Sequence, residues 1–282
     1  MPVIYAEKIV QGLVDQRFTA GLLTGSIVNN NFDWVGVSTV KLYSRDLATL
    51  NNYSLTGTNR FGEVNELGNA LQEMTLTQDK SFTFSIDRRT ADDTLDTMEA
   101  GEALAENIDQ IVIPEIDRYR IASIVAAAPT AGNFSAKSHI ITAATTKANA
   151  YEEFLKTNEL LDEDHVPTRG RICVVTPSFY SKLKLCEEFT KTGDLATQIA
   201  ITGQVGAVDS VAIVRVPSHY MPEDVEFFVT HPVAATAPIK LQMFRILTEV
   251  QGIDGAVCEA RFRHDCFVLN KKKDAIAVHK AA

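Results

Sequence analysis

The feature that most constrains this chain is a helical pattern far longer than an ordinary helix. From residue 92 to about residue 127, apolar side chains recur in steps of three, four or seven, on one face of an α-helix. At 1.5 Å per residue such a helix spans roughly 50 Å, the width of a whole domain. Asp92 and Asp93 suit its N-terminus, and Pro114 should kink it or split it after Ile113. The apolar stripe consists of Leu95, Met98, Ala105, Ile108, Val112, Ile116 and Tyr119.

A long strand-forming segment, residues 37–90, precedes this helix. Val40 and Leu42 indicate a first strand. A second strand is predicted from Met74 to Ile86, where apolar side chains alternate with Ser and Thr. The residues between the strands are rich in Asn, Thr and Gly. Because so long a polar connection is unusual in a compact domain and an isolated hairpin is marginally stable, we expect this segment to lie on another chain.

The N-terminal segment leaves two interpretations open. Residues 4–23 carry a helical apolar stripe, and residues 25–31 are polar and turn-prone. The helix either docks on its own core or is an arm that lies on a neighbouring subunit.

The second half has the pattern of a mixed α/β domain. Helices are predicted to begin at Asn149 and at Thr176, and short apolar runs predict strands at 172–175, 211–217 and 225–230. A long strand pair follows, 239–247 with 257–269. Alternation along 257–269 predicts that Asp265 shares the polar face with Glu259, Arg261 and Arg263, opposite Cys258, Ala260, Phe262, Cys266 and Val268.

Charge and composition exclude several classes of protein. The 27 Lys and Arg residues are outnumbered by 36 Asp and Glu, and the net charge of -9 argues against a DNA-reading protein, whose phosphate contacts need clustered basic residues. No secretory signal is visible, and no apolar run approaches the ~18 residues of a membrane span. The four cysteines are interpreted as free, buried thiols.

The motifs of common active sites and cofactor sites are not found. There is no glycine-rich phosphate loop, and Ser178 does not lie in a nucleophile elbow. Cys258, His264 and Cys266 are interpreted as one packed strand face rather than a zinc site. The acidic run 162–164 is interpreted as a solvated helix end, with a metal or acid/base site left open. Lys271–Lys273 are interpreted as a solvated turn.

The order of these parts resembles the major capsid protein of tailed bacteriophages, the Hong Kong phage capsid fold that encapsulins share. The similarity covers nearly the whole chain and is one of pattern; no single motif is diagnostic. The stretches most similar to the family are 59–62 (NRFG), 71–74 (LQEM), 79–84 (DKSFTF), 203–209 (GQVGAVD) and 214–217 (VRVP).

The resemblance implies an α+β fold with an N-terminal arm, an extended β-hairpin called the E-loop, a long spine helix in a peripheral domain, and a mixed α/β axial domain. The implied boundaries are 1–36 for the arm, 37–90 for the E-loop, 91–149 for the peripheral domain with the spine helix, 150–245 for the axial domain, and 246–282 for peripheral-domain strands and a return to the axial domain.

The function implied is structural. The chain would assemble as pentamers and hexamers into the icosahedral head of a virion, built in the host cytoplasm, which encloses double-stranded DNA without reading its sequence. Separate scaffolding, portal and decoration proteins are expected, with no cofactor, metal, catalytic residue or membrane. The alternatives are an encapsulin-like nanocompartment shell and, less favoured, a soluble enzyme with an unrecognised site. The candidate contacts between subunits are Arg60, Phe61, Lys41, Lys80, Phe18 and Trp34.

Overall fold

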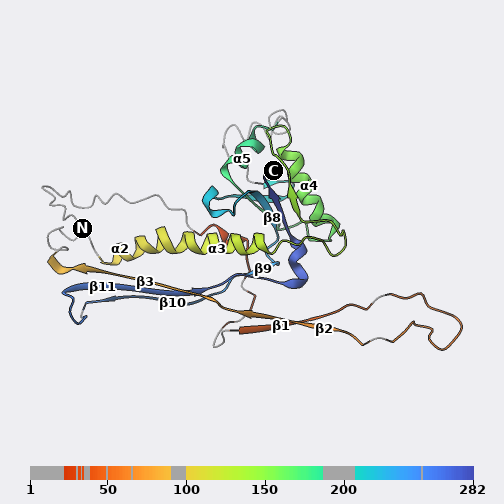
Figure 1. Ribbon diagram of the computed structural model, residues 1–282, viewed down its shortest axis with the longest axis horizontal. Coiled ribbons are helices and arrows are strands. Elements are labelled where there is room, and N and C mark those ends of the chain that lie inside the picture. Colours follow the sequence, from red (N-terminus) through yellow and green to blue (C-terminus); the bar gives the residue numbers. More distant parts are fainter. Residues whose placement is uncertain are drawn as a thin grey trace.

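The computed structural model describes residues 22–29, 31–32, 34, 39–48, 50–64, 66–89, 100–186, 207–248 and 250–282. A long helix lies along a narrow sheet, an α/β lobe covers one end of the helix, and a β-hairpin projects away from both (Figure 1). The α+β class predicted from the sequence is therefore confirmed. The predicted N-terminal helix lies almost wholly outside the described residues, which begin at Leu22.

The long helix consists of α2 (Ala100–Asn107), a π-helical turn η2 (Ile108–Val112) and α3 (Ile113–Ala126). Its predicted end is confirmed, whereas its predicted start lies outside the described residues. The change predicted at Pro114 takes the form of a π turn that ends just before α3, rather than a split after Ile113. Pro114 occupies the first turn of α3, and the N–H of Ile113 donates to the carbonyl of Ile108, five residues earlier. The π turn thus accommodates a residue that has no N–H of its own.

The first part of this helix packs on an antiparallel sheet. The sheet has the order β10 (Ile239–Leu247), β11 (Gly255–His264) and β3 (Gln78–Asp87). Alternate side chains of β3 and β11 point at the helix and cover the described part of its apolar face, in which Leu104 is buried and the predicted Ala105 is exposed. The contacts join Phe82, Phe84, Cys258, Ala260 and Phe262 to Leu104, Ile108, Val112 and Ile116.

The end of α3 packs on a second, six-stranded sheet. Its strand order is β4-β13-β8-β5-β7-β6, with parallel and antiparallel pairs. The strands are β4 (Ile140–Thr142), β5 (Ile172–Val175), β6 (Ala207–Val208), β7 (Val211–Arg215), β8 (Val225–Thr230) and β13 (Ile276–Lys280).

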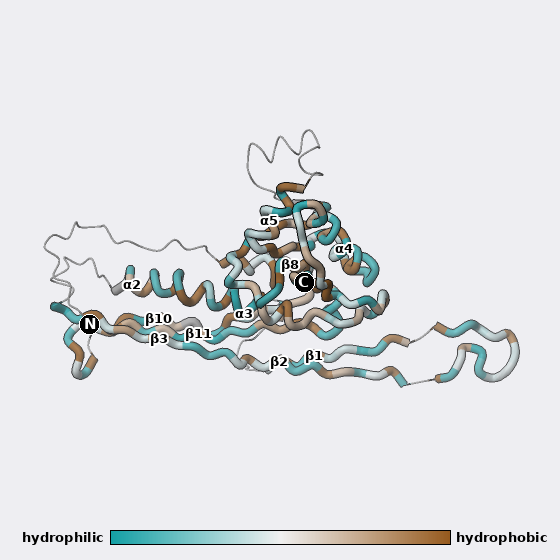
Figure 2. The backbone as a smooth tube through the Cα atoms, turned by 45° about the horizontal axis from the view of Figure 1, so that its top comes forward, coloured by the Kyte–Doolittle hydropathy of each residue, from teal (hydrophilic) through white to brown (hydrophobic). Residues whose placement is uncertain are grey.

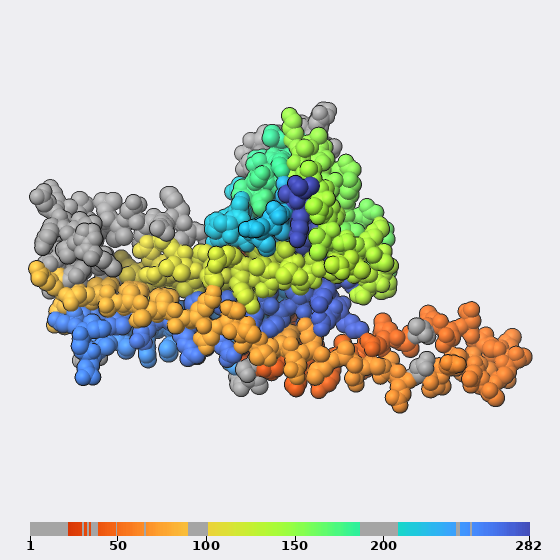
Figure 3. Space-filling view, viewed as in Figure 1, coloured from red at the N-terminus to blue at the C-terminus, as the bar shows by residue number. Residues whose placement is uncertain are grey.

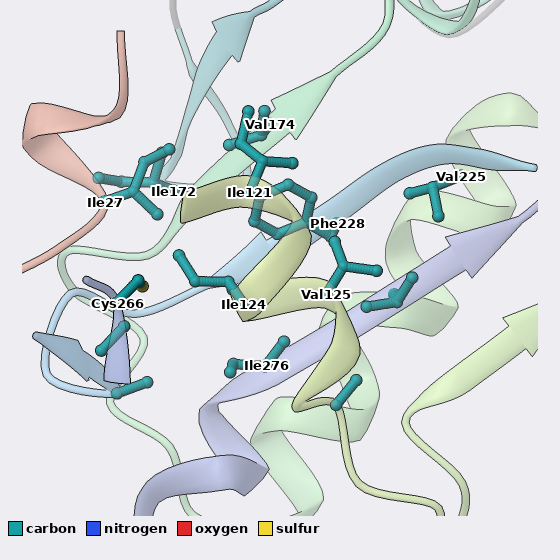
Figure 4. Packing of buried hydrophobic residues seen from close by; sticks show 14 of the residues in the cluster. Ile27, Ile121, Ile124, Val125, Ile172, Val174, Val225, Phe228, Cys266 and Ile276 are labelled. Atoms are coloured by element: carbon teal, nitrogen blue, oxygen red, sulfur yellow. The ribbon is translucent and has the colours of Figure 1, made fainter. Parts of the chain in front are cut away.

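Both faces of this sheet are buried. Val174 and Phe228 face α3, where they meet Ile121 and Ile124 (Figure 4). The opposite face packs on α4 (Ala150–Glu163) and α5 (Pro177–Lys184). Because one helix contributes to the cores of both sheets, it fixes the lobe relative to the narrow sheet.

Short elements complete the described chain. A two-residue pair joins β9 (Ala235–Thr236) to β12 (Phe267–Val268). Three 3-10 turns are η1 (Thr24–Ser26), η3 (Ser218–Tyr220) and η4 (Asn270–Ala275). The four cysteines are free and buried, as predicted. No helix of the described part of the chain is long and apolar enough to cross a bilayer.

Two predicted strands are wrong in extent. The strand expected from Met74 to Ile86 is two strands that belong to different sheets, because the chain turns at Leu76 and Thr77. The strand expected from 257 to 269 ends at His264. Asp265 is consequently 3% exposed rather than on the polar face.

The acidic run at the end of α4 is solvated at Asp162 and Glu163, as predicted, but not at Asp164. Asp162 accepts a hydrogen bond from Arg171, and Asp164 is buried. Asp164 accepts bonds from His139 Nε2 at 2.6 Å and from the backbone N–H groups of Phe134 and Ser135. These hydrogen bonds lower the pKa of Asp164 in spite of its burial. Asp164 therefore holds the loop after α3 against the lobe.

Two buried histidines should make the fold sensitive to acid. His264 stacks on Phe262 with ring centroids 5.6 Å apart, and His279 stacks on Phe227 at 4.8 Å. Among the described residues, neither nitrogen of His264 has a hydrogen-bond partner. The nitrogens of His279 lie 3.5 Å from Glu153 Oε2 and 3.8 Å from Glu226 Oε2, and these carboxylates favour the charged ring less than burial opposes it. Burial lowers the pKa of both rings, because a charged imidazolium is poorly solvated there.

We expect the free energy of unfolding to fall as the pH is lowered from 7 to 5. In this range the unfolded chain protonates both rings near pH 6.5, whereas the folded chain resists, so acid favours unfolding. Each unit of pKa difference corresponds to about 1.4 kcal/mol. Urea denaturation of His264→Phe should show a smaller loss over this range than the wild type. The exposed His219 supplies the control, since His219→Phe should keep the full loss; equal loss in all three chains would contradict the prediction.

Candidate assembly interface

Of the described segments, the hairpin is the most accessible to a partner chain. Strands β1 (Thr39–Arg45) and β2 (Asn69–Thr75) pair antiparallel, from Thr39 opposite Thr75 to Arg45 opposite Asn69. The space-filling view shows the hairpin projecting well beyond the rest of the chain (Figure 3). Its outer part therefore has no support from its own body.

The tip of the hairpin has a defined turn. Ser54 N donates to the carbonyl of Arg60 at 2.9 Å, and Arg60 Nε donates to the carbonyl of Gly57 at 3.2 Å. Gly57 has a φ of +94°, which favours glycine at this position. Tyr53 and Phe61 meet edge to face, with ring centroids 5.1 Å apart. The tip thus presents an aromatic pair beside a guanidinium group.

Apolar side chains are exposed along the outer hairpin. Leu50 and Val64 are fully exposed, and Phe61 is 84% exposed. Figure 2 shows such hydrophobic stretches scattered along the hydrophilic hairpin. A soluble monomer rarely leaves so many large apolar groups in one projecting segment, which indicates a protein contact. The exposed set is Tyr43, Leu47, Leu50, Tyr53, Leu55, Phe61, Val64, Leu67 and Leu71.

The root of the hairpin, in contrast, is packed on its own chain. Met74 and Leu76 are buried against Trp34 and Leu269. Trp34 stacks on Phe267 with ring centroids 5.4 Å apart. The hairpin therefore has a fixed root and an unsupported outer part.

The structure separates the six predicted contact residues. Arg60 and Phe61 lie together at the exposed tip. Lys41 is on β1, where it forms an exposed ion pair with Glu73 at 2.7 Å that raises the pKa of the lysine. Trp34 is buried in its own chain. Phe18 lies outside the described residues.

Lys80 is placed differently from the expectation, which put it at the base of the hairpin. It lies on β3 facing the long helix, and its ammonium pairs with Glu115 of α3. Burial opposes ionisation of this carboxyl, but the hydrogen bonds and charges of Lys80 and Arg118 lower the pKa of Glu115 overall. Lys80 thus joins sheet to helix within one chain.

Sequence reasoning missed most of the apolar contact surface. It described the loop as rich in Asn, Thr and Gly and gave no weight to Leu47, Leu50, Leu55 and Val64. Isolated leucines in a polar loop, with no helical or strand periodicity to bury them, were the available signal.

A buried polar cluster lies where the start of the described chain joins the long helix. Asp117 of α3 is 1% exposed and accepts hydrogen bonds from the backbone N–H groups of Leu23 and Thr24, at 2.9 and 3.2 Å. Arg120 donates to Thr24 Oγ1 and to the carbonyl of Ala237. The start of the described chain is thereby fixed to the long helix. The described residues contain no group of three or more His, Cys, Asp or Glu side chains able to hold a metal ion.

Comparisons with known proteins bear on this architecture. No family model and no curated protein matches the chain. The capsid structure of cyanophage P-SCSP1u is similar with a TM-score of 0.76 and 16% identity, over 98% of this chain and 92% of that chain. The mature capsid of bacteriophage PhiM1 gives 0.76 and 13%, over 98% and 91%. A structure from Mycobacterium phage Che8 gives 0.69 and 17%, over 99% and 96%.

These similarities extend over nearly the full length of each chain. At identities of 13–17% they concern the fold. The chain has the fold of phage capsid structures, and the resemblance expected from the sequence is confirmed at that level.

Proposed function

We propose that this chain is a major capsid protein, a structural subunit that assembles with copies of itself into a closed shell. The observation that carries the proposal is the hairpin of residues 39–75, whose root is buried in its own chain and whose outer part exposes large apolar groups to solvent. Burying one such side chain is worth roughly 1.5–3 kcal/mol, so the hairpin is stabilised when it lies on a neighbouring copy.

The arrangement in the shell follows from this asymmetry. A projecting segment and the surface that receives it are different parts of the chain, which suits a head-to-tail contact; such contacts form rings when the rotation between copies closes. We propose rings of five and six that build the icosahedral head of a virion, with assembly in the host cytoplasm. The net charge of -9 suits a wall that confines double-stranded DNA without gripping it. Scaffolding, portal and decoration proteins complete the proposed set of partners.

The predicted segments map onto the described elements in this proposal. The E-loop is the hairpin β1–β2, and the strand β3 belongs with β10, β11 and the long helix in the peripheral domain. The axial domain is the six-stranded sheet with α4 and α5. Residues 91–149, 150–245 and 246–282 are then divided between the two domains by sheet membership rather than by sequence position.

The direct test is electron microscopy and sedimentation of the purified full chain, across a range of concentration and salt. The proposal expects closed particles or rings. A subunit that stays monomeric or dimeric under every condition would overturn it. Analysis of the particle contents separates the two shell functions, since an enclosed partner enzyme would favour an encapsulin-like compartment over a DNA-filled head.

We propose that Arg60 and Phe61 at the tip contact the neighbouring subunit, with Lys41 nearer the root. Phe61→Ser should leave the fold of the body intact but raise the protein concentration needed for assembly at least tenfold, because an aromatic anchor is lost from each contact. Light scattering during assembly measures this. Phe134 on the lobe is likewise an exposed phenylalanine, 70% exposed, with one edge-to-face ring partner, His165. Phe134→Ser is therefore the matched control and should assemble normally; equal behaviour of the two variants would remove Phe61 from the interface.

A further inference from the structure

Two polar side chains bind the root of the hairpin to the segment that follows β11. The first is Gln72 of β2. Its Nε2 donates to the carbonyl of Val268, and its Oε1 accepts from the N–H of Asn270, both at 2.9 Å. The side-chain amide thus extends the pairing of β2 onto the segment that follows β12. Because the side-chain amide both donates and accepts, the two hydrogen bonds fix its orientation as well as its distance from residues 268–270.

The second is Asp265, which follows β11. It binds Thr77, at the corner where the chain passes from the hairpin into β3. Its Oδ2 accepts from Thr77 N at 2.8 Å and from Thr77 Oγ1 at 2.9 Å. Its Oδ1 accepts from Tyr119 Oη and from Cys266 N, each at 2.8 Å. Burial and this carboxylate raise the pKa of Tyr119, which keeps the phenol a donor. Four donors around one buried carboxylate fix the corner to α3.

Further contacts of the root accompany the hydrogen bonds of Gln72 and Asp265. Met74 and Leu76 are 0% and 2% exposed and pack on Leu269. On the outer side, Lys271 Nζ pairs with Asp46 Oδ1 at 3.0 Å. The hairpin is therefore attached along residues 40–46 and 72–77 to the segment 265–271, which Asp265 in turn joins to α3 through Tyr119. A two-point attachment of this kind resists rotation about either point.

We infer that Gln72 and Asp265 fix the direction of the hairpin within its own chain, so that the hairpin is already oriented before it meets another copy. A segment held in its bound direction loses less conformational freedom on association. This consequence for assembly rests on the proposed function, whereas the orientation itself is a property of the single subunit.

Distance measurement between two spin labels tests the inference. One label replaces the exposed Glu63 near the tip (Glu63→Cys), and the other replaces the exposed Glu159 on α4 (Glu159→Cys). The four native cysteines are buried and so less accessible to the label. Double-labelled chains are diluted in unlabelled protein and measured before and after assembly is triggered. The inference expects one narrow distance distribution that keeps its mean on assembly.

Substitutions at the root should broaden this distribution. Gln72→Ala removes both bonds to 268–270 and should at least double its width. Asp265→Asn replaces one carboxylate oxygen with an NH2 group, which cannot accept the hydrogen bonds that surround it. This variant should broaden the distance distribution in the same way. Glu73→Gln is the control, because it changes the neighbouring residue and breaks only the exposed Lys41 pair; its distribution should stay narrow. Circular dichroism confirms that each variant is folded.

A broad distribution in the unassembled wild type, or an unchanged width in folded Gln72→Ala, would overturn the inference. Neither result bears on whether the wild-type chain forms particles, which tests the proposed function separately. Absence of particles together with a narrow distribution would overturn the function and leave the orientation intact.

Discussion

Replacing residues 47–67 with an Asn-Gly turn is expected to leave a folded subunit that forms no closed particles. Asp46 N donates to the carbonyl of Gly68, so these two residues face each other at the end of the paired strands and accept a two-residue turn. The root contacts and both sheets are untouched. What is lost is the exposed apolar set except Tyr43 and Leu71, at roughly 1.5–3 kcal/mol for each large side chain that assembly would bury.

A second variant distinguishes the loss of apolar contacts from the loss of hairpin length. It keeps the length of the hairpin and changes the exposed apolar residues to serine at Leu47, Leu50, Leu55, Phe61 and Val64. We expect this variant also to fail in assembly, because it lacks the groups that a neighbour would bury. Electron microscopy gives the particle yield, and urea denaturation shows that the body is folded. Normal particles from the shortened chain would contradict the proposed role of the hairpin.

Removing the guanidinium of Arg171 should destabilise the lobe more than any other single change proposed. The side chain is 1% exposed. Its nitrogens donate to Asn158 Oδ1 at 2.6 Å, to the carbonyl of Val166 at 2.6 Å and to the carbonyl of Pro167 at 3.0 Å. These bonds join α4 to the loop before β5. Arg171→Met keeps the stem but leaves the acceptors without donors, and it should cost about 3–5 kcal/mol in the free energy of unfolding.

The matched control removes one exposed partner of the same arginine. Asp162 lies 2.7 Å from Arg171 Nη2, but its side chain is half exposed, so water replaces the lost bond. Asp162→Ala should therefore cost no more than about 1 kcal/mol. Urea denaturation measures both values. A loss below 1 kcal/mol for Arg171→Met would contradict the structural role assigned to the buried guanidinium.

Elements in which apolar residues recur with a regular helix or strand period were predictable from the sequence. The apolar stripe to Tyr119 indicated the long helix, and the missing N–H of Pro114 indicated where it changes. The alternation of β3 and β11 identified the strands whose apolar faces cover this helix. These features depend on local geometry, which the order of residue types determines directly.

Elements fixed by distant contacts were not predictable. The turn at Leu76 and Thr77 depends on Asp265, which is 188 positions from Thr77 along the chain. Extending the alternation of polar and apolar residues past His264 placed Asp265 on the polar face, whereas it is buried. No local feature of the sequence shows that β11 ends at His264. Asp164 was likewise assigned to solvent because its partner His139 lies on the loop after α3.

The candidate interface was predicted in outline. The length and isolation of the hairpin suggested a partner chain, and Arg60 and Phe61 lie at its tip. Lys80 was misplaced because its partner Glu115 is on the helix, 35 positions away. Gln72 carried no signal, because a glutamine on a strand shows its importance only through the backbone groups it binds.

The most direct test of the account asks whether the hairpin lies on its own chain or on another copy. Phe61 is replaced by the photo-crosslinking residue benzoylphenylalanine, and chains of light and heavy isotope content are mixed before assembly. After irradiation, mass spectrometry identifies which chains are joined. We predict crosslinks between light and heavy chains, formed only in assembled particles. Crosslinks confined to single chains would contradict the account.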